Sequence, residues 1–495
     1  MVTTMPSPPS SAPSSTSLSS RSLLERLWST IADRGRSYAD VLQPDASATP
    51  LDRAQELAAA LLSERGEASG AAVARELSLA LQELGPADRL AFYRYLAENF
   101  LPPEDRLRQA AEAYLADATP ENAAQLAEAA DPTRQELLRR INMAPGGTAS
   151  LVAMRRELLD HLRAEPSLKP LDSDLRHLLG SWFNRGFLEL RRIDWQTPAA
   201  VLEKLITYEA VHEIAGWSDL RRRLAPDRRC FGFFHPALPG DPLIFVEVAL
   251  TQGLASSVQP LLAADGDERA ERARESEADT AIFYSISNCQ DGLRGVSFGN
   301  FLIKQVVAEL KAELPGLVRF STLSPVPGFR RWLGKRLASA DVLRDDEAAA
   351  LSLMAGEGGD PVADDPATVL RNVLGTERWW EDAPLAEVLR APLTRLCAAY
   401  LTDPGEDGRP DPVARFHLGN GARLERVNWL GNVAPRGIEE SYGLMVNYLY
   451  DPEQIEANHE AFVRGVVVRS AAVDVLLAPA RPAAAPAAPR RSRKT

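Results

Sequence analysis

A glycine-rich stretch is the first part of the sequence whose residue types and spacing suggest chemistry. Residues 291–300 read DGLRGVSFGN, with Gly292, Gly295 and Gly299 just before an amphipathic pattern. The free N–H groups and aligned dipoles of a helix start favour a bound anion, and glycines let the backbone approach it closely. Phosphate is the usual ligand, and a tight turn without ligand is the plain alternative. The spacing matches neither G-x-x-x-x-G-K-[ST] nor the G-x-G-x-x-G of dinucleotide folds.

Predicted strands and one helix surround this stretch. The strand AIFYSIS at 281–287 precedes it, a helix from about 299 to 314 follows, and LVRFSTLS at 317–324 predicts the next strand. Two earlier strands are predicted at 230–236 and 242–251. The apolar face of the helix consists of Leu302, Ile303, Val306, Val307, Leu310 and Leu314. The pattern is a strand–loop–helix–strand unit with glycines in its loop.

The N-terminal part of the chain has an almost purely helical signal. Leu77, Leu81 and Leu84 fall at i, i+4 and i+7, and Gly85-Pro86 ends that helix and opens the next. No group of residues in this region demands chemistry. We therefore expect it to serve as a scaffold and in subunit contact.

Composition divides the chain into four parts. A Ser/Pro-rich tail is expected at 1–20, a helical domain at 21–184, a domain of strands and helices at 185–475, and an Ala/Pro-rich, finally basic tail at 476–495. Both tails are expected to be disordered.

Charge and composition limit the function classes. The net charge of −12 argues against nucleic-acid binding, although the basic run Arg221-Arg222-Arg223 leaves room for a small anionic ligand. Three separated cysteines indicate neither a disulfide framework nor a zinc site. The apolar runs are too short for a membrane-spanning helix.

The glycine loop resembles that of GNAT-type acyl-CoA enzymes. RGVSFG at 294–299 is similar to their [QR]-x-x-G-x-[GA] loop, whose amides hold the pyrophosphate of coenzyme A. Ser297 stands where that motif has glycine, and serine still offers a backbone N–H. The resemblance assigns CoA binding to Arg294, Gly295, Val296, Ser297, Phe298, Gly299 and Asn300.

Four longer stretches resemble the malonyl-CoA decarboxylase family. They are AIFYSISNCQDGLRGVSFGNFLIKQVV, FSTLSPVPGF, FHLGNGARLERVNW and YGLMVNYLYDP, in this order and at about the family's spacings. The resemblance covers about residues 185–462 and extends more loosely over the helical half. It implies an α+β two-domain fold: an N-terminal all-helical bundle, then a GNAT-like α/β catalytic domain with a mixed sheet. The implied activity is that of a carboxy-lyase, which converts malonyl-CoA to acetyl-CoA and CO2.

The same resemblance assigns catalytic roles. Decarboxylation leaves an enolate on the thioester, which needs a proton at C2. His417, in RFHLGNGA, is the expected proton donor, since imidazole titrates near neutral pH. Ser324 falls on the family's L-S-P-x-P-G-F pattern, whereas Ser321 does not, and Ser324 is expected to accept a proton and contact the malonyl carboxylate. Tyr450 is expected either beside this centre or as a packed strand residue.

Partners and cofactors follow from the implied reaction. The thioester delocalises the electrons, so neither a metal nor another cofactor is expected, and coenzyme A is part of the substrate. The family's helical domains form oligomers, which implies a homotetramer or dimer. The chain ends Ser492-Arg493-Lys494-Thr495 rather than in the peroxisomal S-K-L, so a cytoplasmic location is preferred.

Two other functions remain compatible with the sequence. A GNAT-type N-acetyltransferase would keep the fold and move an acyl group from CoA to an amine. A scaffold built on the helical domain would keep only a degenerate, non-catalytic CoA site.

Overall fold

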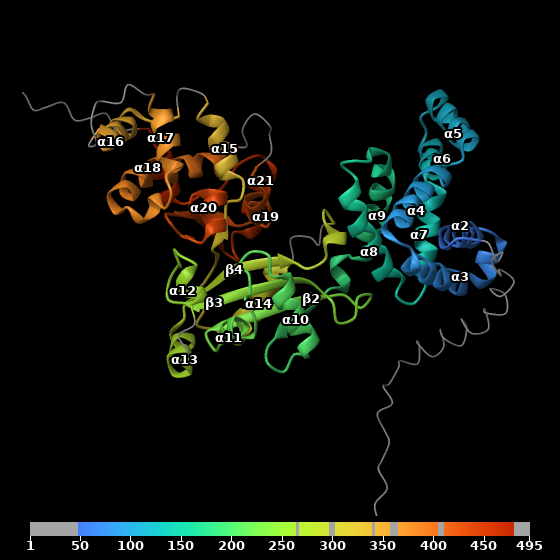
Figure 1. Cartoon of the computed structure of the whole chain (residues 1–495), viewed down its shortest axis with the longest axis horizontal. Coiled ribbons are helices and arrows are strands. Elements are labelled where there is room, and N and C mark those ends of the chain that lie inside the picture. The colour runs from blue at the N-terminus through green and yellow to red at the C-terminus, as the bar shows by residue number, and fades with distance from the viewer. Residues whose placement is uncertain are drawn as a thin grey trace, which may run out of the picture. The chain divides into compact units, whose positions relative to one another are not determined.

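The computed structural model describes residues 48–263, 267–296, 302–338, 342–356, 365–403 and 410–479. They fall into two compact units (Figure 1). One unit covers the chain up to Trp182 together with Gly292–Val296, and the other covers Phe183–Asp291 and the chain from Ser297 onward. Grouping Gly292–Val296 with the helices was not predicted from the sequence.

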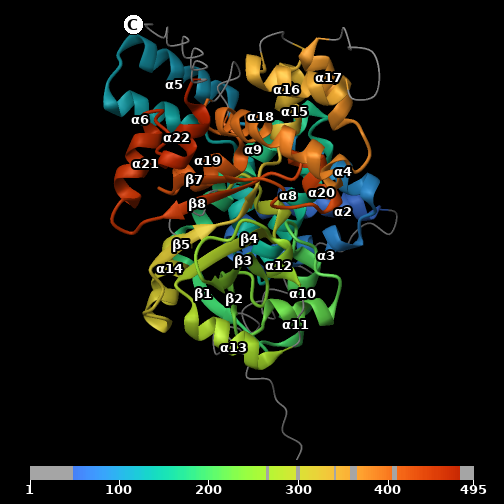
Figure 2. The ribbon, with the colours of Figure 1, turned by 90° about the vertical axis from the view of Figure 1, so that its left-hand side faces the viewer.

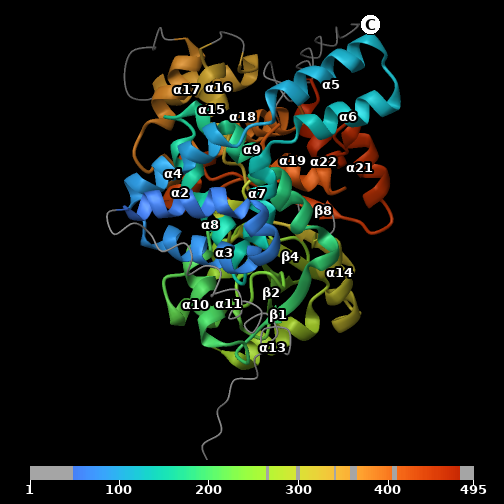
Figure 3. The same cartoon turned by 90° about the vertical axis from the view of Figure 1, so that its right-hand side faces the viewer.

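The first unit is a bundle of helices, as Figure 3 shows. Gly85 caps α4 and Pro86 occupies its first turn, as the sequence predicted. Leu77, Leu81 and Leu84 are all buried, which confirms the predicted apolar face. The helices are α2 (Pro50–Leu61), α3 (Glu64–Glu83), α4 (Pro86–Asn99), α5 (Glu104–Ala116), α6 (Pro120–Ala130), α7 (Thr133–Asn142), α8 (Gly147–His161) and α9 (Lys169–Trp182).

The second unit is built on a mixed sheet whose strand order is β1-β2-β3-β4-β5-β8-β6, with β7 paired to β8. β4 and β5 are parallel because the helix α14 (Leu302–Glu313) connects them, and the other strand pairs are antiparallel. The fold class is thus confirmed as a helical region followed by a mixed-sheet α/β domain. The strands are β1 (Glu189–Ile193), β2 (Arg228–Phe234), β3 (Pro242–Thr251), β4 (Thr280–Asn288), β5 (Arg319–Thr322), β6 (Ser324–Pro325), β7 (Arg423–Asn428) and β8 (Met445–Tyr450).

Helices surround this sheet, and Figure 2 shows α19, α21 and α22 near β7 and β8. A run of helices that the sequence analysis did not resolve separates β6 from β7. The predicted apolar face of α14 is confirmed, since Leu302, Ile303, Val306, Val307 and Leu310 are buried. The further helices are α10 (Ala199–Tyr208), α11 (Trp217–Arg223), α12 (Gln259–Leu262), α13 (Glu268–Glu277), α15 (Phe329–Arg336), α16 (Asp345–Gly356), α17 (Pro366–Leu374), α18 (Ala383–Thr402), α19 (Pro412–Gly419), α20 (Pro435–Ser441), α21 (Ile455–Val463) and α22 (Ala471–Leu477). Residues 1–20 of the predicted N-terminal tail, 21–47 of the predicted helical domain and 480–495 of the tail predicted at 476–495 lie outside the described residues. The start predicted for that second tail is too early, because α22 continues to Leu477.

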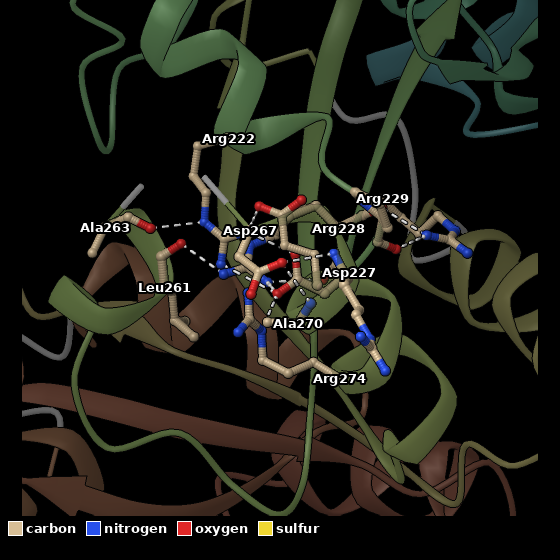
Figure 4. A network of polar contacts seen from close by, with 12 residues as sticks. Arg222, Asp227, Arg228, Arg229, Leu261, Ala263, Asp267, Ala270 and Arg274 are labelled. Atoms are coloured by element: carbon tan, nitrogen blue, oxygen red, sulfur yellow. Dashed lines mark hydrogen bonds and ion pairs between the residues drawn. The ribbon is translucent and has the colours of Figure 1, made fainter. Parts of the chain in front are cut away.

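A buried polar network joins α11, β2 and α13 (Figure 4). Asp227 is fully buried and accepts hydrogen bonds from Arg222 Nη1 (2.7 Å) and Arg274 Nε (2.7 Å). Burial would raise the pKa of Asp227, but the hydrogen bond from Arg222 and the charge of Arg228 lower it overall. Arg222 of the predicted basic run is therefore engaged by the Asp227 carboxylate, and Arg223 is engaged by the carboxyl group of Glu247, which lies 3.0 Å from its Nη1. These two side chains therefore form contacts inside the fold and do not face a small anionic ligand.

Candidate active site

The three residues predicted to be catalytic lie on three different elements. Ser324 opens β6, His417 lies in the last turn of α19, and Tyr450 is the last residue of β8. Leu323, fully buried just before Ser324, donates its N–H to the Phe283 carbonyl (2.9 Å). This bond fixes the chain at the junction of β5 and β6.

A hydrogen-bonded chain brings these side chains together. Ser324 Oγ lies 3.2 Å from His417 Nε2, and the Tyr450 hydroxyl lies 2.8 Å from His417 Nδ1. Ser324 also donates to Thr322 Oγ1 at 2.8 Å. All four side chains are buried. The serine and histidine, 93 residues apart in sequence, are therefore direct neighbours.

Two contacts from Tyr448 hold the hydrogen-bonded side chains in place. Thr322 Oγ1 accepts a second hydrogen bond, from the Tyr448 N–H at 3.1 Å. The Tyr448 ring stacks on the imidazole of His417, with 4.8 Å between centroids and 23° between planes. One stacking contact and two hydrogen bonds thus restrict the rotation of the imidazole.

The helix that carries His417 begins at a buried carboxylate. Asp411 Oδ1 accepts the N–H groups of Val413 (2.9 Å) and Ala414 (3.1 Å), and Pro412 occupies the first helical position. Asp411 Oδ2 also accepts the Gly328 N–H at 3.3 Å. The helix of His417 is thereby tied to the loop that follows Ser324.

Close packing explains the glycine of the L-S-P-x-P-G-F pattern. A Cβ on Gly328 would lie 2.0 Å from the Tyr400 hydroxyl, which itself donates to Asp411 Oδ2 at 3.1 Å. Only glycine leaves room for this approach. Gly328, Tyr400 and Asp411 therefore form one packed support for the site.

Burial controls the charge of the histidine. His417 is 4% exposed, and desolvation lowers its pKa to about 3. Burial also raises the pKa of Tyr450 well above its usual value, so this hydroxyl keeps its proton. At neutral pH all four side chains of this hydrogen-bonded network, those of Thr322, Ser324, His417 and Tyr450, are therefore neutral. One consistent set of directions runs from Tyr450 O–H to Nδ1, from Nε2–H to Ser324 Oγ, and from Ser324 O–H to Thr322 Oγ1.

The glycine loop is described only in its first half. Arg294 and Gly295 are exposed, and Gly295 has a φ of +78°, a conformation that favours glycine. The N–H of Val296 donates to the Leu293 carbonyl at 2.9 Å, so this predicted CoA-binding amide is engaged in a turn. Ser297, Phe298, Gly299 and Asn300 lie outside the described residues.

Sequence reasoning missed the supporting residues of the site. Thr322 and Ser324 are separated by two positions, the spacing of one strand face, but nothing in the sequence marked Thr322 as a hydrogen-bond acceptor. The Asp411-Pro412 pair is a helix-start signal from which the beginning of α19 could have been predicted. The stacking of Tyr448 on His417 depends on tertiary packing and had no sequence signal.

Comparisons with known proteins identify the family to which the chain is similar. The model for the malonyl-CoA decarboxylase C-terminal domain matches residues 186–486, and the N-terminal domain model of the same family matches residues 100–183. The chain belongs to the malonyl-CoA decarboxylase family. The goose (Anser anser anser) protein named "Malonyl-CoA decarboxylase, mitochondrial" is 40% identical over 344 residues, which are 67% of this chain and 66% of that protein. The chain therefore matches just under two thirds of that relative's length.

Solved structures of this family have similar folds. Malonyl-CoA decarboxylase from Rhodopseudomonas palustris is 50% identical, with a TM-score of 0.76 over 86% of this chain and 99% of that one. The protein of the same name from Agrobacterium vitis is 49% identical, with a TM-score of 0.75 over 86% of this chain and 100% of that one. The family resemblance inferred from sequence motifs is thus confirmed.

The described residues meet the requirements of neither a metal site nor a membrane-spanning helix. Among the residues that the structure describes, there is no group of three or more His, Cys, Asp and Glu side chains that could hold a metal ion. Within the same residues, no helix has the length and apolar character needed to cross a bilayer. The cytoplasmic location stays a prediction.

Proposed function

We propose that this protein is a malonyl-CoA decarboxylase that converts malonyl-CoA to acetyl-CoA and CO2. The observation that carries the proposal is the buried chain of Ser324, His417 and Tyr450, in which adjacent groups are 3.2 and 2.8 Å apart. The names of its relatives support the same substrate. The roles of Ser324, His417 and Tyr450 are part of the proposal.

The reaction consumes one proton. The bond between C2 and the terminal carboxylate breaks, its electron pair passes into the thioester as an enolate, and neutral CO2 leaves. C2 then takes a proton to form the methyl group of acetyl-CoA. Because the thioester accepts the electrons, the proposed step uses no further cofactor.

His417 supplies that proton in the proposed mechanism. In the free protein its pKa of about 3 keeps it neutral, because a charged imidazolium in this buried position is poorly solvated. A malonyl carboxylate beside the ring favours the imidazolium, so a proton from solvent adds to Nδ1 as the substrate binds, and the Tyr450 hydroxyl turns from donor to acceptor there. When CO2 leaves, the negative charge moves to the enolate, and the imidazolium donates its proton to C2.

Hydrogen bonds select the nitrogen that donates. Tyr450 faces Nδ1, so Nε2 is the nitrogen that faces Ser324 and the proposed position of the malonyl group. Ser324 accepts from Nε2–H, and its hydroxyl turns from Thr322 to donate to the substrate carboxylate. The carboxylate is thereby held next to the imidazole whose protonated form it stabilises.

The diphosphate of coenzyme A is proposed to bind at the glycine loop. The exposed Arg294 and the positive φ of Gly295 support this assignment. Because the Val296 amide is engaged in a turn, we assign the remaining donors to Ser297, Phe298, Gly299 and Asn300, with Arg294 as the counter-charge.

The helical domain, proposed at residues 21–184, is also proposed to mediate self-association as a dimer or tetramer. Large apolar side chains are exposed on it, including Leu115 (84%), Met143 (63%) and Leu101 (53%). Light scattering coupled to gel filtration measures the mass directly, and a monomer at micromolar concentration would refute this part.

Incubation of the purified full chain with malonyl-CoA tests the proposed activity. We expect stoichiometric acetyl-CoA and CO2 in the absence of any amine. An N-acetyltransferase would release free CoA only when an amine acceptor is added, and a scaffold would form neither product. Either of these outcomes would refute the decarboxylase proposal.

A further inference from the structure

Side chains supply the hydrogen bonds that hold the strand just before Ser324 to β8. β5 and β6 both pair with β8, and the two pairings are separated by a gap at residues 322–323. In this gap Asn447 Nδ2 donates to the Thr322 carbonyl at 2.7 Å, and the Tyr448 N–H donates to Thr322 Oγ1 at 3.1 Å. The asparagine amide thus binds a carbonyl that would otherwise be left unpaired at the break in the sheet.

The hydrogen bonds of Asn447 fix its orientation. The side chain is fully buried, and its Nδ2 also donates to the Ala255 carbonyl at 3.1 Å. Its Oδ1 accepts from Arg426 Nε at 3.1 Å and from Asn428 Nδ2 at 2.9 Å. Because a guanidinium can only donate and a carbonyl can only accept, the amide fits in one orientation. Its bond to Thr322 is therefore directional and set by the surrounding fold.

The anchor of this amide lies on the neighbouring strand. β7 pairs with β8, and Arg426 on β7 donates from Nη2 to the carbonyls of Leu254 and Ala255, at 3.1 Å each (Figure 2). Successive side chains of a strand point to opposite faces of the sheet. Because Tyr448 stacks on His417, Asn447 lies on the face away from the imidazole. Asn447 therefore supports the site from behind and stays clear of the substrate.

Thr322 is the link between this anchor and the reacting groups. Its Oγ1 accepts the hydroxyl of Ser324 at 2.8 Å, and Ser324 Oγ lies 3.2 Å from His417 Nε2. The position of Thr322 therefore sets where the serine hydroxyl lies. A shift of the Thr322 backbone would be passed to Ser324 through this bond.

We propose that Asn447 is a positioning residue for decarboxylation, acting through the Thr322 hydroxyl on Ser324. This inference rests on the proposed function, which assigns Ser324 and His417 to the reaction. Groups that are held in place before the substrate arrives need not be ordered during the reaction, which lowers the barrier. Asn447 contacts no reacting atom in this account.

Asn447→Leu tests the role, because leucine has a similar shape and can neither donate nor accept. We expect kcat for malonyl-CoA to fall by about tenfold, the effect of losing one hydrogen bond. The dissociation constant for free CoA, measured by calorimetry, should stay within about twofold. Free CoA carries no malonyl group for Ser324 to hold, so a loss confined to kcat indicates a misplaced serine.

Asn432 offers a matched control in the same unit. It is likewise buried (8% exposed), and its Oδ1 accepts the Ala434 N–H at 3.1 Å, at the start of α20. Asn432→Leu therefore removes the same kind of group and leaves the bonds of Thr322 intact. We expect it to lower the melting temperature and to keep kcat within about twofold.

A double-mutant cycle shows whether Asn447 acts through Thr322. Thr322→Val removes the hydroxyl that accepts from Ser324, so Asn447→Leu should then have little left to disturb. We expect kcat of the double variant to lie within about threefold of the slower single variant. Independent effects would multiply to about 100-fold.

Three results would overturn the inference: wild-type kcat in folded Asn447→Leu, an equal loss of kcat in Asn432→Leu, or multiplicative losses in the cycle. If Asn447→Leu does not fold, Asn447→Asp retains the acceptor for Arg426 and Asn428, and its carboxylate cannot donate to Thr322. Wild-type kcat in that variant would also overturn the inference. A wild-type chain that does not decarboxylate malonyl-CoA would instead refute the proposed function.

Discussion

Binding of a malonyl group should bring one proton onto His417. In the free protein, burial holds the pKa of His417 at about 3, so the imidazole is neutral at pH 7. The proposed reaction needs an imidazolium beside the bound substrate. The substrate carboxylate must therefore raise the pKa of His417 above 7.

The size of this shift can be worked out from the site. Raising the pKa from about 3 to 7 requires roughly 5 kcal/mol, at about 1.4 kcal/mol per unit. A carboxylate bonded to Ser324 comes close to His417 Nε2, which lies 3.2 Å from Ser324 Oγ. A charge about 4 Å away contributes about 4 kcal/mol at an effective dielectric constant of about 20, and a charged hydrogen bond adds about 2 kcal/mol. Together these terms are just sufficient to protonate the ring.

Calorimetry detects the proton directly. The probe is a malonyl-CoA analogue whose terminal carboxylate is replaced by a sulfonate, which cannot leave as CO2. Binding enthalpies at pH 7 in two buffers of different ionisation enthalpy give the number of protons taken up. We expect about one for the wild type and for His212→Gln, and none for His417→Gln. No uptake by the wild type, or equal uptake by His417→Gln, would refute the reasoning.

Two further predictions concern groups around the sheet. Thr322→Val removes the oxygen that accepts from Ser324 and from the Tyr448 N–H, so kcat should fall by about tenfold with unchanged CoA affinity, while Thr322→Ser retains activity. A kcat equal to the wild type in Thr322→Val would exclude this positioning role. Burial and the nearby Glu209 raise the pKa of Glu247 to about 8 against the effect of Arg223, so the folded protein keeps a proton there that the unfolded chain loses above about pH 4.5. The stability contributed by this group is therefore complete below pH 4.5 and lost as pH rises towards 8. The free energy of unfolding of the wild type relative to Glu247→Gln should fall by about 1 kcal/mol per pH unit between pH 5 and 7.5, and parallel urea-unfolding curves would contradict the assignment.

Local sequence patterns predicted the elements that position the site. The apolar periodicity of residues 302–310 identified the buried face of α14, and the short apolar runs at 230–236, 242–251, 281–287 and 317–324 identified strands β2 to β5. These signals are local because side-chain periodicity reflects which face of an element is buried.

Tertiary relations explain what the sequence could not predict. His417 and Ser324 were chosen by family resemblance, because no spacing rule brings together residues 93 positions apart. Arg222 and Arg223 were read as potential anion ligands, but pairing with Asp227 and Glu247 depends on how α11 packs on β2 and β3. The hydrogen bond from the Val296 amide to the Leu293 carbonyl likewise depends on a turn. Glycines allow this turn, but their presence in the sequence does not predict it.

Turnover by a matched pair of histidine variants tests the central claim most directly. His212 is also buried (7% exposed), and burial lowers its pKa to about 4, but it contacts Tyr284 instead of Ser324. We expect His417→Gln to lose about 100- to 10,000-fold in kcat for conversion of malonyl-CoA to acetyl-CoA, with CoA affinity retained, and His212→Gln to keep its turnover. A His417→Gln variant that decarboxylates malonyl-CoA at the wild-type rate would contradict the account.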